Sequence, residues 1–92
     1  MIIGCLVLDI HFPFSHSLKE KRRELNSIRD RMKRYNAACS ELDFQEKWQL
    51  ARIGIVTISG NQKIVESHLQ KILRDIEENS EGQITQSRLE FF

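Results

Sequence analysis

The stretch Ile2-Ile3-Gly4-Cys5-Leu6-Val7-Leu8-Asp9-Ile10-His11-Phe12, followed by a helix start at Ser17-Leu18-Lys19-Glu20, decides the fold. Residues 2–12 have high β-propensity, and Pro13 closes the strand that they predict. The even positions of this strand are all apolar or glycine, whereas the odd positions become polar at Asp9 and His11. One face of the strand therefore belongs to a core, and the other face is only partly exposed to water.

The segment after this strand predicts a helix over residues 17–35. Ser17 and Glu20 have the Ser-x-x-Glu spacing of a capping box, in which the serine side chain accepts from the third helical amide. At about 100° per residue, one arc of the helix is almost wholly apolar and is expected to pack on the sheet. That arc consists of Leu18, Leu25, Ile28, Met32 and Tyr35.

The rest of the chain supplies the other elements of a small α+β domain. Residues 37–43 predict a short strand, and residues 51–59 are apolar enough on both faces to form a central strand. Apolar residues recur at helical spacing from Ile64 to Ile76, and residues 83–92 alternate as a last strand. The order βαββαβ predicts one ferredoxin-like domain over residues 1–92, a two-layer sandwich with both helices on one face of a four-stranded antiparallel sheet. The expected core includes Leu6, Leu8, Leu25, Ile28, Ile55, Leu69 and Ile72.

Composition is that of an ordinary globular domain, with 40% hydrophobic and 29% charged residues among 92. No apolar run approaches the roughly 20 residues that a membrane span needs. The first residues lack a positively charged start and run into Asp9, so we expect no signal peptide and a cytoplasmic location. Cys5 and Cys39 lack the spacing of metal ligands, and two buried thiols are expected in that reducing compartment.

Positive charge is concentrated in the first helix. Residues 17–35 contain eight Lys and Arg against three Asp and Glu, whereas the whole chain has a net charge of only +1. Most of these basic residues fall on an arc of about 140° beside the apolar arc, a pattern that favours an anionic partner. RNA is the first choice, and a solvated helix flank is the alternative. The candidate RNA-binding residues are Lys19, Lys21, Arg22, Arg23, Arg29, Lys33 and Arg34.

Catalytic motifs are missing from the sequence. It contains no Gly-rich phosphate loop, His-Glu-x-x-His, Gly-x-Ser-x-Gly or Cys-x-x-Cys, so we expect neither an enzyme nor a bound cofactor or metal. Asp9 and His11 project from the same face of the first strand, and Asp43 or Glu41 from a neighbouring strand could join them. A small metal-dependent hydrolase on such residues is the most remote alternative.

Two further features leave alternatives open. We expect Trp48, the only tryptophan, to close one end of the core, although an aromatic near basic residues could instead stack on a nucleic-acid base. The odd-numbered side of the first strand, with Ile3, Cys5 and Val7, is apolar for a wetted face. It predicts, as the alternative function, a homodimeric protein-interaction module without nucleic-acid binding.

Three sequence elements carry a family resemblance: Ser17-Leu18-Lys19-Glu20-Lys21-Arg22 directly after a strand, then Glu41, then Gln45-Glu46-Lys47-Trp48-Gln49. Together they resemble the YlxP-like family of small bacterial proteins. The resemblance implies a ferredoxin-like fold, no established enzymatic activity, and genes near those for translation initiation factor two and ribosome-binding factor A. It therefore implies a role in RNA binding or ribosome maturation. Glu46 replaces a frequent Asp and keeps the charge, whereas Leu50 replaces a frequent Arg and removes one basic group.

Overall fold

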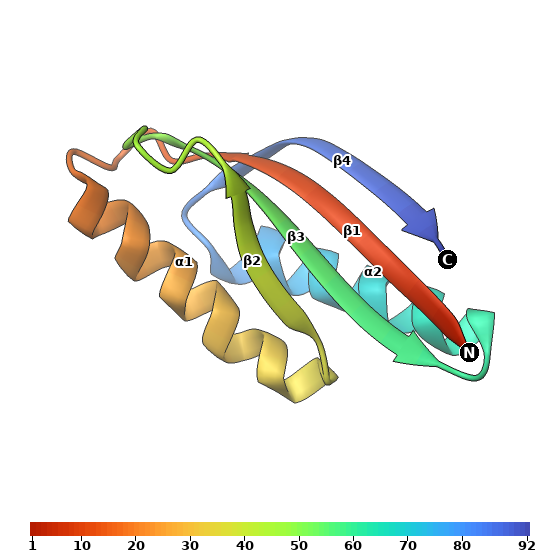
Figure 1. Ribbon diagram of the computed structural model, residues 1–92. Coiled ribbons are helices and arrows are strands. Elements are labelled where there is room, and N and C mark those ends of the chain that lie inside the picture. Colours follow the sequence, from red (N-terminus) through yellow and green to blue (C-terminus); the bar gives the residue numbers. More distant parts are fainter.

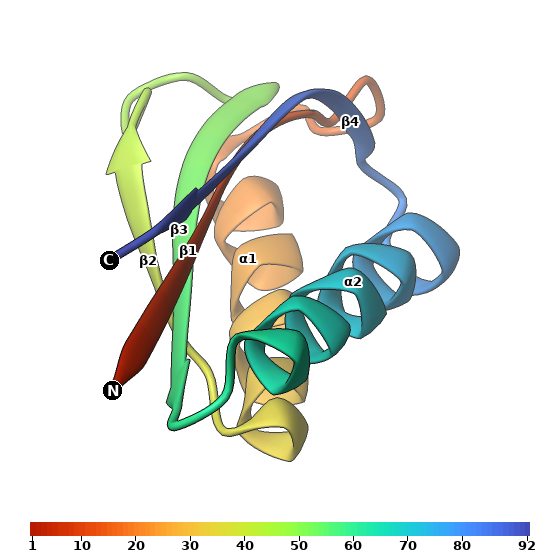
Figure 2. The ribbon, with the colours of Figure 1, turned by 90° about the vertical axis from the view of Figure 1, so that its right-hand side faces the viewer.

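The computed structural model describes residues 1–92 and has the predicted order of elements (Figure 1). These are β1 (Ile2–His11), α1 (Leu18–Met32), the 3-10 turn η1 (Lys33–Tyr35), β2 (Ala38–Asp43), β3 (Leu50–Ser59), α2 (Gln62–Asn79) and β4 (Gln83–Phe91). The strands form one antiparallel sheet in the order β2-β3-β1-β4. Figure 2 shows both helices on the same side of this sheet. The predicted ferredoxin-like α+β fold is confirmed.

The core lies between the sheet and the two helices. There the apolar side chains at every second strand residue pack against the apolar side chains that recur about every 3.6 residues in the helices. Even-numbered residues of β1 point to the helices, and Leu6 lies opposite Ile55 of β3 and Leu89 of β4. A side chain at Gly4 would collide with Val65 and Leu69, so the glycine allows α2 to approach β1 closely. All the predicted core residues are buried: Leu6, Leu8, Leu25, Ile28, Ile55, Leu69 and Ile72.

The start of α1 is fixed by side-chain caps. Ser17 Oγ accepts a hydrogen bond from the Glu20 backbone N–H at 3.1 Å, as the capping-box spacing predicts. Glu20 Oε2 in turn accepts from the backbone N–H of His16 at 2.8 Å. In a standard capping box the donor would be the backbone N–H of the N-cap residue, here Ser17. The chain leaves the helix through η1 and Asn36, whose left-handed φ of 51° is a conformation that asparagine tolerates.

The arrangement leaves one face of the sheet uncovered, because both helices lie on the other face (Figure 2). The connections β1–α1 and β2–β3 meet at one end of the sheet, whereas both chain termini lie at the other end (Figure 1). Neither helix combines the length and the apolar character needed to cross a membrane. The surfaces available for function are therefore the outer sides of the two helices, the loop end and the open sheet face.

Candidate nucleic-acid interface

The outside of α1 and η1 carries a set of exposed basic side chains, here called the basic face. Its members are Lys19, Arg22, Arg23, Arg29, Lys33 and Arg34. Asp30 is the one acidic residue among them, and its 3.7 Å pair with Lys33 joins two side chains that are each more than 70% exposed. Such a pair contributes little, so the face keeps nearly all its positive charge available.

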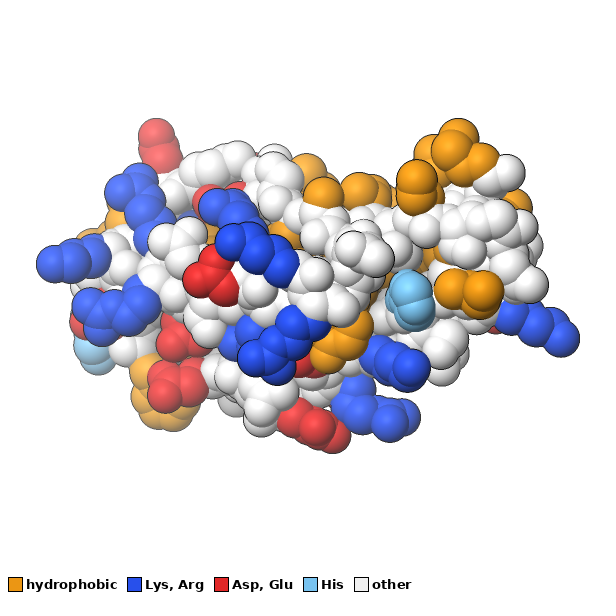
Figure 3. All heavy atoms as spheres, turned by 90° about the horizontal axis from the view of Figure 1, so that it is seen from below, with side chains coloured by type: hydrophobic (Ala, Val, Ile, Leu, Met, Phe, Trp, Pro, Cys, Tyr) orange, Lys and Arg blue, Asp and Glu red, His pale blue; other side chains and the backbone are white.

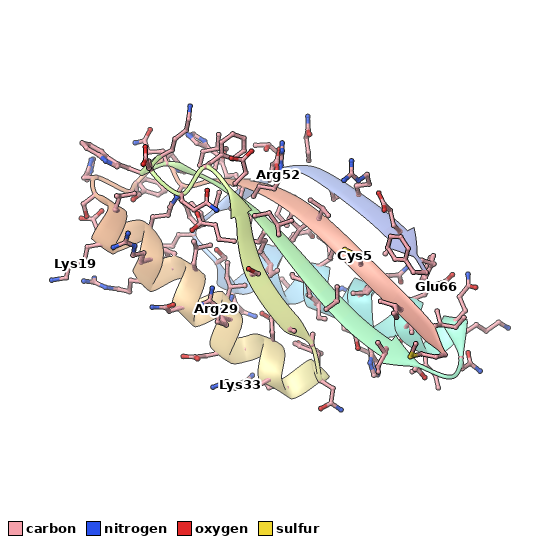
Figure 4. All side chains as sticks on the ribbon, in the orientation of Figure 1. Cys5, Lys19, Arg29, Lys33, Arg52 and Glu66 are labelled. Carbon is pink, nitrogen blue, oxygen red and sulfur yellow. The ribbon has the colours of Figure 1, made fainter.

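The basic face runs along the whole helix. Lys19 and Lys33 are fourteen positions apart, which at 1.5 Å per residue is about 21 Å. Figure 4 shows Lys19 near the start of α1, and Arg29 and Lys33 one turn apart towards its end. In the view from below, Lys and Arg side chains stand along the surface with several Asp and Glu side chains between them, and hydrophobic atoms gather towards the upper right (Figure 3). Charges spaced in this way can contact successive phosphates of one strand.

Lys21 does not belong to this face, and the expectation that it binds RNA is wrong. Its side chain is 1% exposed, and Nζ donates to the carbonyl oxygens of Phe44 at 2.8 Å, Leu50 at 3.2 Å and Gln45 at 3.4 Å. Glu41 Oε2 lies 2.9 Å from Nζ and makes an ion pair without hydrogen-bond geometry. The physical reason is position, because residue 21 falls in the middle of the buried arc of α1.

Lys21 therefore fixes the connection between β2 and β3, here called the 44–50 loop. A second clamp comes from Gln49, whose Nε2 donates to Pro13 O at 3.3 Å and Ser15 O at 3.1 Å. The backbone N–H of Phe12 also donates to Gln49 O at 2.8 Å. The 44–50 loop is thus tied to α1 on one side and to the β1–α1 connection on the other.

The aromatic residues of this loop end are mostly on the surface. Trp48 is 54% exposed, so the expectation that it closes the core is wrong. The end of the core is closed instead by Phe12, and the loop is held through its backbone carbonyls. Phe44 lies between two cations, with the Arg52 guanidinium 5.0 Å and Lys47 Nζ 5.9 Å from its ring centre.

Arg31 is the second basic residue of α1 that serves the structure. Its Nε donates to Asp75 Oδ1 of α2 at 2.7 Å, and Tyr35 OH donates to Asp75 Oδ2 at 2.9 Å. Burial alone would raise the pKa of Asp75, but the hydrogen bonds from Arg31 and Tyr35 and the charge of Arg31 hold it below its ordinary value. Hydrogen bonding to Asp75, together with burial, raises the pKa of Tyr35. This cluster joins the two helices.

The acidic residues proposed for a metal site are used differently. Asp9 accepts two hydrogen bonds from Arg52, at 2.7 and 3.1 Å, and Asp43 lies 3.7 Å from the same guanidinium. The hydrogen bond from Arg52 is the main reason why the pKa of Asp9 is lowered. Glu41 is occupied by Lys21 on the helix side of the sheet, and no three His, Cys, Asp or Glu side chains come together as metal ligands. The trio around Asp9 and His11 that the remote metal-site alternative requires does not form, because Arg52 lies between the two aspartates.

The open sheet face carries an apolar patch near the strand ends opposite the loops. Ile58 is 60% and Val56 39% exposed, and the β1–β3 register places them opposite Ile3 and Cys5. Ile3, Cys5 and Val7 are themselves half-buried. Figure 4 shows Cys5 on this face.

The two thiols are half-buried, not fully buried as expected. Cys5 lies on the open face, where no layer covers it. Cys39 packs against the core from β2, and burial raises the pKa of its thiol.

Comparison with known proteins gives a family but no activity. Residues 3–89 match the family described as "Protein of unknown function (DUF503)". The chain is 34% identical over 89 residues to the uncharacterized protein YlxP of Bacillus subtilis (strain 168), covering 96% of this chain and 91% of that protein. Among solved structures, the de novo designed protein Ferredog-Diesel is similar with a TM-score of 0.52 and 14% identity, over 96% of this chain and 83% of that one. At that identity the structural similarity shows the fold alone.

Proposed function

Because this chain belongs to the DUF503 family of proteins of unknown function, we propose a function from its own surface: a non-enzymatic, cytoplasmic accessory protein that binds RNA, alone or in ribosomal particles, through the basic face. The observation that carries this proposal is the sorting of charge. Six of the eight basic residues in the first helical segment stand exposed on one side, in a chain whose net charge is +1. Contacts from Lys and Arg to phosphates release counterions, which supplies most of the affinity for an RNA backbone.

The spacing of these charges argues against a purely structural role. Lys19 and Arg23 are one helical turn apart, and so are Arg29 and Lys33. Like charges at this spacing destabilise a helix by a few tenths of a kcal/mol per pair. Glu20, which could have relieved the repulsion, is placed on the opposite flank and is used to cap the helix start. The helix thus keeps its positive charges together at a small cost in stability.

The test compares two variants with the same change in charge. The first exchanges Arg22, Arg29 and Lys33 for Gln on the basic face, and the second exchanges Lys63, Lys71 and Arg74 for Gln on α2, where all three are exposed. Binding of fluorescent ribosomal RNA fragments is measured at about 50 mM salt, and cosedimentation with ribosomal particles is followed in parallel. We expect at least a tenfold loss for the first variant and less than about threefold for the second. Equal affinities for the parent and the first variant would refute the proposal.

A second candidate function rests on the apolar patch of the open sheet face. Ile58 and Val56 are exposed beside Ile3, and a second copy of the chain could cover them as an isologous partner. Sedimentation of the parent at high micromolar concentration should then show a dimer that persists at high salt, because apolar contacts are not screened. Ile58→Lys and Val7→Lys should each give a folded monomer. A monomeric parent would remove this candidate.

A further inference from the structure

We propose that the 44–50 loop is a stacking platform for an unpaired RNA base, with Trp48 as the aromatic surface. The inference rests on the proposed function and adds a ligand class to it. RNA would be single-stranded where it passes the loop end, and its backbone would continue along the basic face. A duplex could use the basic face but not the platform, because its bases are already stacked on one another.

Trp48 has no structural task that accounts for its position. It is the only tryptophan of the chain, it is 54% exposed, and it is absent from the core and from the residues packed against the core. The loop is held by backbone carbonyls and by the Gln49 amide, none of which depends on an indole ring. A large aromatic side chain kept in water on a fixed loop is typical of a binding contact.

The loop is ordered before any ligand arrives. Lys21 Nζ binds carbonyls at both ends of the loop, at Phe44 and Leu50, and Gln49 clamps it to the β1–α1 connection. Lys47 N–H donates to Phe44 O at 2.9 Å and closes a turn within it. Stacking on Trp48 would therefore not require an ordering of the loop, and more of the stacking energy would appear as affinity.

The 44–50 loop is tied to α1, the helix that carries the basic face on its other side. Lys21 joins the second turn of α1 directly to the loop, and the neighbouring Arg22 and Lys19 belong to the basic face. A second exposed aromatic lies at the same end, because the carbonyls on either side of Phe14 accept from Gln49, and Phe14 is 68% exposed. The two exposed aromatic side chains thus lie at the end of the molecule where α1 begins (Figure 1).

The surroundings of Trp48 favour a nucleobase over an apolar protein segment. A shallow hollow beside the indole is lined by His11, Glu46, Lys47, Gln49 and Leu50, of which only Leu50 is hydrophobic. A base presents a flat π-surface with polar edges, so it can stack on the indole while its edges meet the imidazole, amide and ammonium groups. An apolar peptide side chain would find one aromatic and few other apolar contacts there.

The test uses Trp48 as its own probe, since no other tryptophan contributes to the fluorescence. The full-length protein is titrated at low salt with oligouridine of about 12 nucleotides and with an RNA duplex of the same length. We expect quenching with the single strand and binding without quenching, seen by anisotropy of a labelled duplex, with the double strand. Trp48→Ala should weaken single-strand binding about 5- to 150-fold and leave duplex binding unchanged. Trp48→Phe should recover part of the loss.

A matched control and the remaining outcomes separate this inference from the proposed function. Phe92→Ala removes an aromatic that is 68% exposed at the other end of the sheet, and it should leave both affinities unchanged. If the basic-face variant loses RNA affinity but Trp48→Ala does not, the platform is refuted and the proposed function stands; Trp48 would then be available to a protein partner. An equal loss for single strand and duplex in Trp48→Ala would also refute the platform. If the parent binds neither RNA, both ideas fail.

Discussion

Helix α1 places basic side chains on its inner and its outer face and uses them in opposite ways. Lys21 and Arg22 are neighbours in sequence, yet Lys21 is 1% exposed among four oxygen atoms, and Arg22 stands in solvent without a partner. The comparison shows that the angular position on the helix, not the charge, decides whether a basic residue supports the fold or remains available to a ligand. The Ser17–Arg22 motif thus combines a cap, a buried clamp and part of a binding surface.

The energetic difference between the two faces follows from solvation. A buried ammonium has lost its water, and three carbonyls and the Glu41 carboxylate replace that hydration. The exposed residues of the basic face keep their water and gain little from one another. Substitutions on the inner face should therefore change stability, and substitutions on the outer face should change RNA binding.

The largest stability effect is expected at Lys21. Lys21→Met keeps the length and the helix propensity but leaves three carbonyls and Glu41, whose side chain is 18% exposed, without their cation. We expect a loss of roughly 2–4 kcal/mol in the free energy of unfolding, measured with urea. Lys19→Met, two positions away on the outer face, is the matched control and should lose less than about 0.5 kcal/mol. Similar losses of unfolding free energy in the two variants would contradict the distinction between a structural inner face and an available outer face of α1.

The next effect concerns the cluster that joins α1 to α2. Asp75→Asn removes the charged partner of Arg31 and should cost roughly 1.5–3 kcal/mol at neutral pH. In the parent, the lowered pKa of Asp75 gives stability that is complete above the ordinary value of 3.8 and is lost as the pH falls below it. Urea unfolding between pH 5 and pH 2 should therefore be less pH-dependent in Asp75→Asn than in the parent. Parallel profiles would show that this pair does not contribute to acid stability.

The same cluster also affects stability at alkaline pH, where the contribution of Tyr35 decreases as the pH rises. The raised pKa of Tyr35 gives stability that is complete below its ordinary value of 10.0 and is lost as the pH rises through the folded-state pKa. Tyr35→Phe cannot ionise, so the dependence of its unfolding free energy on pH above 10 should be weaker. Absorbance of the phenolate in the native parent should appear at a higher pH than in the unfolded chain. Coincident titrations would contradict this.

The smallest change in the free energy of unfolding is expected when residues of the basic face are substituted. The Arg22, Arg29 and Lys33 to Gln variant removes the repulsion between Arg29 and Lys33, and all three side chains are exposed. Its free energy of unfolding should stay within about 0.5 kcal/mol of the parent. A loss above about 1.5 kcal/mol would place these residues with Lys21 as structural elements.

Most of the fold was predictable because local patterns and the global arrangement agree. The alternation of residues 2–12, the cap at Ser17 and the apolar spacing of α2 each indicate the element that forms there. Lys21 was also within reach of the sequence, since residue 21 lies within the arc of Leu25, Ile28 and Met32. The prediction assigned Lys21 to the RNA-binding set because it is basic. The structure shows that its angular position on the helix decides whether it is buried.

Other features of the surface depend on pairings that the sequence does not reveal. Asp9 and Asp43 look like potential ligands until the strand register places Arg52 of β3 between them. Trp48 looks like a core residue by composition, because hydropathy alone does not show that its loop is held by Lys21, which binds the loop carbonyls, and by the side-chain amide of Gln49. Strand register and long-range polar contacts are properties of the folded chain. They determine the contacts of Asp9 and Asp43 with Arg52 and the exposure of Trp48 on the 44–50 loop.

The dependence of RNA affinity on salt tests the division of α1 most directly. If three to five groups of the basic face contact phosphates at once, single-strand affinity of the parent should fall roughly 20- to 130-fold over a fourfold rise in salt. The slope of log affinity against log salt should become less negative by about 2 in the Arg22, Arg29 and Lys33 to Gln variant, and it should not change in the Lys63, Lys71 and Arg74 to Gln variant. The same slope in all three proteins would contradict the assignment of the outer face of α1 to RNA.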